Sequence, residues 1–291
     1  MKRMGLMLGI CLLVSCTIAA AQEQPEMTPP KVLGVFREFT KPGRNGTPHE
    51  KTEAAFVQAE TRAKAPTHYL GLESVSGKPR AVFLTGYDSF DAWEKDVQNT
   101  QKNAVLAAAL DRAEAADSDL LDSTDAAALV FRPELSLRPN SDLPHMRYFE
   151  ISTYHVREGH DKDFEEIVKL YQKGCNNLPD CHWAMYQAVY GAEDGTYIVF
   201  NPLKSAAEID HNFGQMKDFS DALGEDGMKR LGELAAAAVE SSQSNLFTIN
   251  PHMSYAPEEW IKADPAFWKP KTSMAEGKKP AAKPAEKPAG Q

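Results

Sequence analysis

The 291-residue sequence is poor in positive charge. It carries 32 Lys and Arg residues against 41 Asp and Glu residues, which gives a net charge of −9. A tail that begins at Lys269 holds six of the lysines, so the remainder of the chain is more acidic than this total indicates. An acidic body repels phosphate backbones, and we therefore expect no nucleic-acid partner.

Several catalytic motifs are also missing. The sequence contains no Gly-x-Ser-x-Gly elbow, and no Gly-x-Gly-x-x-Gly follows a strand-like segment. The segment from Gly71 to Pro79 resembles a phosphate-binding loop, but its glycines are separated by five residues and a proline stands where Ser or Thr is required. No two histidines or carboxylates show a spacing typical of metal ligands, so we expect neither a metal nor a cofactor.

Long apolar runs are absent except at the N-terminus. Residues 1–21 have the pattern of an export signal, with Lys2 and Arg3 before a short apolar run and small residues up to Ala21. Two processing routes stay open: cleavage after Ala21, or acylation of Cys16 in a lipobox-like Leu-Val-Ser-Cys segment. We expect a periplasmic or secreted protein, or a lipid-anchored envelope protein, without a spanning segment. Residues 22–30 are a linker.

Only four cysteines are present, and two of them belong to the signal. The remaining pair, Cys175 and Cys181, is separated by a short segment that contains a proline. In an oxidising compartment such a pair is expected to form a disulfide. A metal site is the weaker alternative, because His182 is the only further ligand type nearby.

The chain contains two similar halves, residues 31–140 and 145–260. Strand-like runs, turns, helix starts and the pairs Val130-Phe131 and Leu246-Phe247 recur in the same order at an offset of about 116 residues. Each half is predicted to run strand, helix, strand, strand, helix, a further helical stretch, strand, which contains the ferredoxin-like order. Residues 269–291 are rich in Lys, Pro and Ala and are predicted to be a disordered tail.

The first strand of each half shows alternation, which assigns its residues to two faces. Leu33, Val35 and Phe39, with Phe149 and Ile151 in the second half, form the more apolar set, which we expect to lie under the helices. The other set is both aromatic and polar. If the two sheets pack face to face, this second set would line a cavity between the halves.

These features resemble the dimeric α+β barrel superfamily, near its NIPSNAP-like and antibiotic-biosynthesis-monooxygenase-like proteins. The resemblance rests on the run from Tyr148 to His160, the helix from Asp161 and the strand-loop-helix around Pro202 to Ser205. It implies an α+β fold in which two antiparallel sheets form a barrel, within one chain or in a homo-oligomer. Members include cofactor-free oxygenases, haem-dependent enzymes and binding proteins, so fold alone does not decide activity.

The expected cavity face supplies the candidate site residues. Glu150 is the candidate catalytic base, able to take a proton from a phenolic or enolic substrate. The candidate ligand-binding residues are Phe36, Glu38, Tyr69, Tyr148, Ser152, Tyr154 and Trp183. The alternatives are a salt bridge with a neighbouring arginine for the carboxylates and ordinary sheet packing for the aromatic residues.

The histidines allow a haem hypothesis but do not favour it. His155, His182 or His211 could supply one axial ligand to the haem iron. None of them has a second ligand residue at a sequence spacing that indicates a haem site. His49 and His160 each open a helix, where hydrogen bonding at the helix start is a sufficient explanation. The sequence therefore predicts binding of a small aromatic or apolar molecule between the halves. A monooxygenase-like enzyme that uses a cavity carboxylate is the alternative, and haem binding a further one.

Overall fold

The computed structural model describes residues 27–269, so the expected signal, Cys16 and nearly all of the tail lie outside the described residues. The chain runs twice through the order strand, helix, strand, strand, two helices, strand. The first half consists of β1 (Val32–Thr40), α1 (Thr47–Ala63), β2 (Tyr69–Ser74), β3 (Arg80–Tyr87), α2 (Phe90–Lys102), α3 (Ala104–Asp117) and β4 (Leu121–Phe131). The second consists of β5 (Tyr148–Val156), α4 (Asp161–Gly174), β6 (Ala184–Tyr190), β7 (Thr196–Leu203), α5 (Ala207–Gly214), α6 (Met216–Ala238) and β8 (Val239–Ile249), followed by α7 (Glu258–Ala263) and α8 (Pro265–Trp268).

The eight strands form one closed barrel in the order β1-β3-β2-β8-β5-β7-β6-β4, and all of its strand pairs are antiparallel. Within each half the first strand of the half lies between the third and the fourth. The halves join where β2 pairs with β8 and where β4 pairs with β6. A single chain therefore closes the barrel without a second copy, and closure leaves no free sheet edge.

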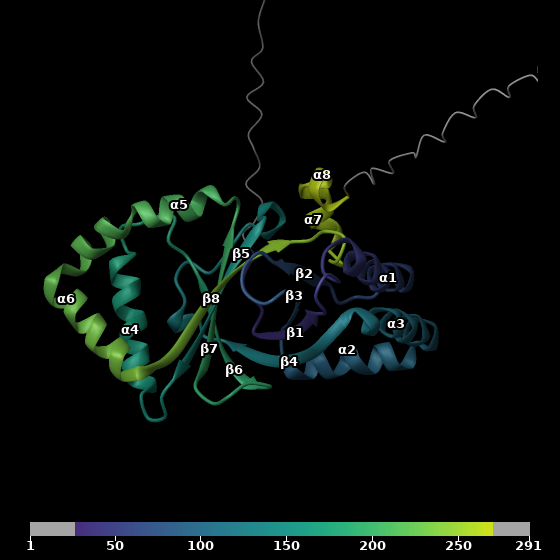
Figure 1. The fold of residues 1–291 in the computed structure, drawn as a ribbon, viewed down its shortest axis with the longest axis horizontal. Helices are drawn as coiled ribbons and strands as arrows, with labels where there is room; N and C mark the ends of the chain where they lie inside the picture. Colours follow the sequence, from purple (N-terminus) through teal and green to yellow (C-terminus); the bar gives the residue numbers. More distant parts are fainter. Residues whose placement is uncertain (1–26, 270–291) are drawn as a thin grey trace, which may run out of the picture.

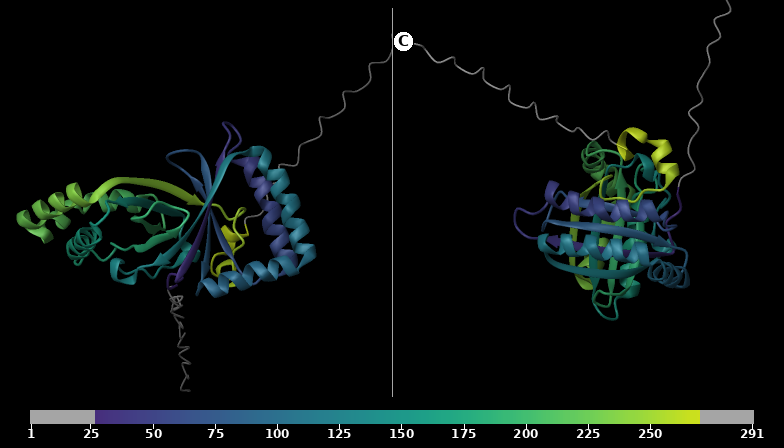
Figure 2. Two further views of the ribbon diagram at one scale, coloured as in Figure 1. Left: turned by 90° about the horizontal axis from the view of Figure 1, so that it is seen from below. Right: turned by 90° about the vertical axis from the view of Figure 1, so that its right-hand side faces the viewer.

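The helices lie on two opposite outer sides of the barrel, α1–α3 on one side and α4–α6 on the other (Figures 1 and 2). Helix α4 shows why it packs there, because Phe164, Ile167 and Val168 form one buried stripe at helical spacing. These residues contact Val156 and Tyr197 on the outer face of the strands. None of the helices in residues 27–269 is long and apolar enough to cross a membrane.

The main core fills the barrel, and here the sequence analysis assigned the strand faces the wrong way round. Leu33, Val35 and Phe149 lie in the core cluster inside the barrel, not under the helices. The alternate residues, such as Tyr154, point outward to the helices. A closed barrel has a narrow interior that excludes water, so its inner face takes the more apolar set of side chains.

The two ends of the barrel differ. Trp260 of α7 and Trp268 of α8 are buried in the core cluster at the end where β5 begins and β8 ends. The indole of Trp268 donates a hydrogen bond of 2.9 Å to the carbonyl of Pro144 and so fixes the C-terminal segment over this end. The opposite end, where β1 ends and β3 begins, has no comparable cover among the described residues, and a cavity lies there.

The expected disulfide between Cys175 and Cys181 is confirmed, with the two Cα atoms 5.8 Å apart. It closes the loop that follows α4. The guanidinium of Arg138 donates hydrogen bonds to the carbonyls of Leu178 at 2.7 Å and Cys181 at 2.9 Å. The disulfide and Arg138 together hold this loop against the segment between the two halves.

Candidate functional site

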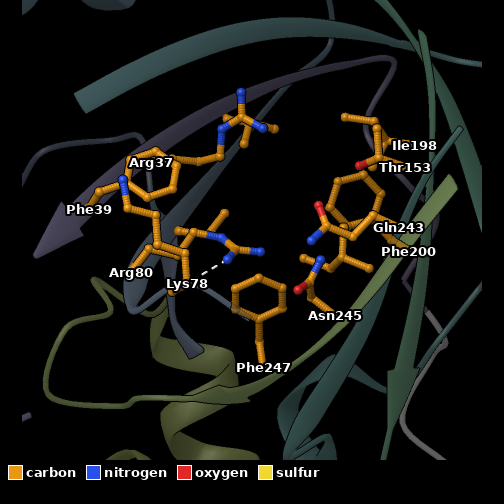
Figure 3. A pocket seen from close by; sticks show the side chains of 13 residues that line it. Arg37, Phe39, Lys78, Arg80, Thr153, Ile198, Phe200, Gln243, Asn245 and Phe247 are labelled. Atoms are coloured by element: carbon orange, nitrogen blue, oxygen red, sulfur yellow. Dashed lines mark hydrogen bonds between the residues drawn. The ribbon is translucent and has the colours of Figure 1, made fainter. Parts of the chain in front are cut away.

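A cavity of about 280 Å³ lies inside the barrel between the two halves (Figure 3). Strands β1 and β3 of the first half and β5, β7 and β8 of the second half contribute to its wall. The residues that line it are Val35, Arg37, Phe39, Lys78, Arg80, Val82, Ile151, Thr153, Ile198, Phe200, Gln243, Asn245 and Phe247. It is large enough for a molecule built on one aromatic ring.

Strand register explains how these side chains come together. In the β1–β3 pair Phe39 lies opposite Arg80 and Arg37 lies opposite Val82, and directly opposed residues share a face of the sheet. Alternation along β8 turns Gln243, Asn245 and Phe247 to the same interior. Figure 3 shows the two amide side chains pointing toward the basic residues across the cavity.

The first half supplies three basic side chains to this cavity, and two of them have carboxylate partners. Arg37 forms an ion pair with Asp125, and the Nζ of Lys78 lies 3.5 Å from the Oδ2 of Asp122. The Lys78 side chain is 57% exposed, which places it at the rim. No ion pair of 4.0 Å or less joins Arg80 to a carboxylate in residues 27–269, although the charge of Asp125 acts favourably on this guanidinium from farther away.

Two of the basic side chains lie over aromatic rings. The guanidinium of Arg80 is 4.8 Å from the ring centroid of Phe247, and the Nζ of Lys78 is 4.6 Å from that of Phe39. One N–H of Arg80 donates a hydrogen bond of 2.9 Å to the carbonyl of Lys78. A guanidinium has five N–H donors, so Arg80 retains donors for a bound group.

Burial, and after it the charge of Arg37, lowers the pKa of Arg80 from its ordinary value. The guanidinium is nevertheless charged at neutral pH. A bound anion would restore the favourable interaction that burial removes, and the aromatic and aliphatic walls would contact its apolar part. No carboxylate is among the lining residues, so the described wall contains no strong proton acceptor. The arrangement is suited to binding an anion rather than to removing a proton.

None of the candidate residues from the sequence lines this cavity. Glu38 points to the outer side of β1 and accepts a hydrogen bond of 2.9 Å from His49 of α1. Phe36, 41% exposed, lines an outer hollow with Trp93 of α2. Tyr69 lies edge-on to Phe83 on the outer side of β2, 6.0 Å between ring centroids.

The candidates of the second half also lie apart from the cavity. Tyr154 packs on Phe164 of α4, 5.8 Å between ring centroids, and Ser152 shares a hydrogen bond of 2.6 Å with Ser244. Tyr148 and Glu150 alternate with inward residues of β5 and are half-buried on the same outward face. The indole N–H of Trp183 donates a hydrogen bond of 2.8 Å to the carbonyl of Leu135. A ligand-binding role for these residues stays a prediction, because none of them is among the residues that line the cavity.

The three histidines of the haem hypothesis also lie outside the cavity. His182 contacts two backbone carbonyls, those of Asp180 at 2.7 Å and Pro202 at 2.9 Å, one with each ring nitrogen. His155 shares a hydrogen bond of 3.0 Å with Thr196. His211 is exposed and contacts Gln215 at 2.9 Å. His182 and His211 both contact Asp180, the latter through its carboxylate at 3.3 Å, but neither is among the residues that line the cavity.

Sequence reasoning missed the basic and amide residues of the cavity, although a signal for them exists. Arg37 lies two residues after Val35, and Asn245 lies two residues before Phe247, so each shares a strand face with a residue of the core. Polar residues in phase with an apolar set mark the position where a barrel interior becomes polar. That interpretation depends on knowing that the apolar set faces the barrel and not the helices.

No model of a protein family and no curated protein matches this sequence. Solved structures with a similar fold do exist. One is a protein of Fusobacterium nucleatum that carries a provisional designation as a monooxygenase; it is 12% identical, with 77% of this chain and 94% of that chain covered and a TM-score of 0.50. Others are an anthrone oxidase-like protein (14% identical, 75% and 91% covered, TM-score 0.46) and a chlorite dismutase of Candidatus Nitrospira defluvii (10%, 81% and 96%, TM-score 0.45).

The similarity to the Fusobacterium protein shows that the two chains share a fold. This agrees with the resemblance seen in the sequence, whereas a closer relation to NIPSNAP-like proteins is not confirmed. At this level of identity the likeness concerns the fold alone.

Proposed function

We propose that this chain is an exported protein that binds a small anionic molecule with an aromatic or apolar body inside its barrel. In this proposal the halves are two ferredoxin-like units of a duplicated chain, residues 31–140 and 145–260, and their sheets enclose the ligand. The anionic group of the ligand contacts Arg80 and the amides of Gln243 and Asn245. Its apolar body lies against Phe200 and Phe247.

The observation that carries the proposal is the environment of Arg80. Its guanidinium lies within the barrel wall, over the ring of Phe247, and has no carboxylate partner among the described residues. Partial desolvation of a charge without a close partner is unfavourable, and a bound anion would offset that cost. A carboxylate bound bidentately by the guanidinium would supply that compensation.

Export is supported by two separate features. Residues 1–21 carry the signal pattern, and the disulfide between Cys175 and Cys181 is compatible with an oxidising compartment. Cleavage after Ala21 and acylation of Cys16 both stay open in this proposal. Association into a homo-oligomer also stays a prediction, since one chain closes the barrel by itself.

The monooxygenase-like alternative has less support. It requires a carboxylate in the cavity as base, and neither Glu150 nor Glu38 is among the lining residues. Haem binding likewise finds no histidine there. Neither alternative is favoured by a specific contact in the described part of the chain.

Isothermal titration calorimetry with three ligands of similar size, each built on one phenyl ring, tests the proposal. We expect benzoate to bind, benzyl alcohol to bind at least about tenfold more weakly, and benzylammonium not to bind, because only the anion matches Arg80. Arg80→Met should reduce benzoate affinity to that of the alcohol. Arg44→Met, which changes an exposed arginine outside the cavity, is the matched control. Equal binding of all three ligands would overturn the proposal.

A further inference from the structure

A second polar cluster lies on the opposite side of β1, away from the cavity. It consists of Glu38 of β1, His49 and Glu53 of α1, and Asp117 at the end of α3. All four residues are buried, with 5%, 1%, 3% and 1% of their surfaces exposed. One potential ligand atom from each residue lies within 4.8 Å of all the others. Three carboxyl groups thus converge on one imidazole in the interior of the protein.

Hydrogen bonds within the protein do not satisfy this cluster. The Nε2 of His49 lies 2.9 Å from the Oε2 of Glu38, 3.5 Å from the Oδ1 of Asp117 and 3.8 Å from the Oε1 of Glu53. A single N–H can serve only one of these acceptors well. Among the described residues the Oε1 of Glu53 and the Oδ2 of Asp117 have no hydrogen-bond partner. A buried carboxyl oxygen without a partner is costly, so these oxygens point to a missing ligand.

The four potential ligand atoms lie within 4.8 Å of one another, which is close enough for one ion to lie among them. Metal–ligand bonds of about 2.1 Å separate neighbouring ligand atoms by about 3.0 Å in an octahedron and about 3.4 Å in a tetrahedron. The distances from the Nε2 of His49 to Glu38 and Asp117, 2.9 and 3.5 Å, lie close to these values, and the 3.8 Å to Glu53 requires that carboxylate to move closer to a bound ion. The hydroxyl of Thr52 contacts the Oδ1 of Asp117 and so orients that carboxylate, as groups beyond the direct ligands commonly do.

The second half of the chain shows that the fold does not require such a cluster. By the offset of 116, Tyr154 occupies the position of Glu38, and their partners Tyr197 and Ala81 correspond by the same offset. When the helix starts at His49 and His160 are aligned, an offset of 111 residues, Phe164 stands where α1 has Glu53. Phe164 packs on Tyr154 with 5.8 Å between ring centroids and is 2% exposed. An aromatic pair fills this site in one half, so the carboxylates and the histidine in the other half serve something besides packing.

We propose that Glu38, His49, Glu53 and Asp117 bind one divalent transition-metal ion. One imidazole and three carboxylates form a mixed nitrogen and oxygen donor set, which suits Mn²⁺, Fe²⁺ or Zn²⁺. The ion would neutralise most of the converging negative charge and satisfy the oxygens that lack partners.

The sequence analysis expected no metal, because the four ligands come from three elements that are distant in the chain. Its interpretation of His49 as a helix-start residue was incomplete. His49 and Glu53 are four residues apart and so lie on one face of α1. That pair is a recognisable signal, but Glu38 and Asp117 join it only through the tertiary fold.

Metal content and spectroscopy of the whole chain test the proposal. Because the cluster is buried, Mn²⁺, Zn²⁺ or Co²⁺ is added both to the folded protein and during refolding from urea with the disulfide intact. After dialysis we expect elemental mass spectrometry to find about one ion per chain. With Co²⁺ we also expect visible absorption bands of the bound ion. His49→Ala and the isosteric Glu53→Gln should each weaken binding at least tenfold.

The matched control is His160→Ala, which removes the histidine at the corresponding helix start of the second half. His160 pairs only with Asp163 in the described residues, 2.7 Å away, and its side chain is 38% exposed. This variant should bind metal like the parent protein. Two results would overturn the proposal: no ion retained after refolding with any of the three metals, or equal binding by the parent, Glu53→Gln and His49→Ala.

Discussion

The guanidinium of Arg80 in β3 lies 4.8 Å from the ring centroid of Phe247 in β8, so one contact inside the barrel joins the two halves of the chain. The cation comes from the first half and the aromatic ring from the second. Such a contact compensates part of the desolvation of the guanidinium, but it leaves the outer N–H groups without an anion. Both the proposed binding role and a stability cost follow from this pair.

Replacement of Arg80 by methionine should separate binding from stability. Without ligand, Arg80→Met should stabilise the fold by about 1 kcal/mol, because an apolar chain of similar length replaces a charge that has no partner. The same variant should lose benzoate binding. Urea unfolding measures the first effect and calorimetry the second. A variant that is strongly destabilised while binding is kept would show that Arg80 serves the fold instead.

A larger side chain at Thr153 should block the cavity without disturbing its charges. Thr153 lies on β5 across from the basic residues, and a phenylalanine there would occupy space that a ring-sized ligand needs. We expect Thr153→Phe to reduce benzoate affinity at least about tenfold. Thr153→Val, which keeps the size of the side chain, should retain most of the affinity. Unchanged binding by Thr153→Phe would place the ligand elsewhere.

The disulfide should contribute to stability without affecting ligand binding. Replacing Cys175 and Cys181 by serine should lower the free energy of unfolding by about 2 kcal/mol in the chain-entropy model for a short loop. Denaturant unfolding of the double variant measures this loss. Affinity for benzoate should be unchanged, because neither cysteine lines the cavity. A parallel loss of affinity in a folded double variant would contradict this separation.

The metal-free protein should become less stable as the pH rises. Burial raises the pKa of Glu53 to about 9, and that of His49 is about 10, both above their values of 4.5 and 6.5 in an unfolded chain. Groups with raised pKa values in the fold favour it below the unfolded pKa, and this contribution is lost as the pH rises through the folded pKa. Glu38, Asp117 and Glu114 face the same cluster, and burial raises the pKa of Glu38 as well.

Chemical unfolding between pH 5 and about 10 measures how the free energy of unfolding falls with pH. Glu53→Gln should flatten it, since glutamine does not titrate. His160→Ala should leave it unchanged. A stability that rises with pH over this window, or a slope unaffected by Glu53→Gln, would contradict the assignment of the cluster.

The sequence predicts the order of elements well and their orientation poorly. The offset of 116 residues predicts the same element order in each half, as observed, and the resemblance to the dimeric α+β barrel superfamily implies the antiparallel barrel. Alternation states which residues share a face, such as Val35 with Phe39, but not which face lies inside. Closure of the barrel decides that, and closure depends on the pairs β2–β8 and β4–β6, which join distant segments.

The same limit explains the site residues. Glu38 was expected in the cavity because it alternates with apolar residues, whereas the fold turns it to α1 and His49. Arg80 attracts no attention in the sequence, since an arginine after a turn is ordinary on a protein surface. Its importance arises only when β8 brings Phe247 beside it. Local sequence patterns therefore predict the strands, whereas pairing between distant strands determines which side chains meet at the site.

A crystal structure of the chain with 4-bromobenzoate tests the binding role most directly, because the anomalous signal of bromine locates the ligand. The account predicts bromine inside the barrel near Phe200, with the carboxylate hydrogen-bonded to Arg80. Bromine found only outside the barrel, or a carboxylate turned away from Arg80 toward solvent, would contradict it.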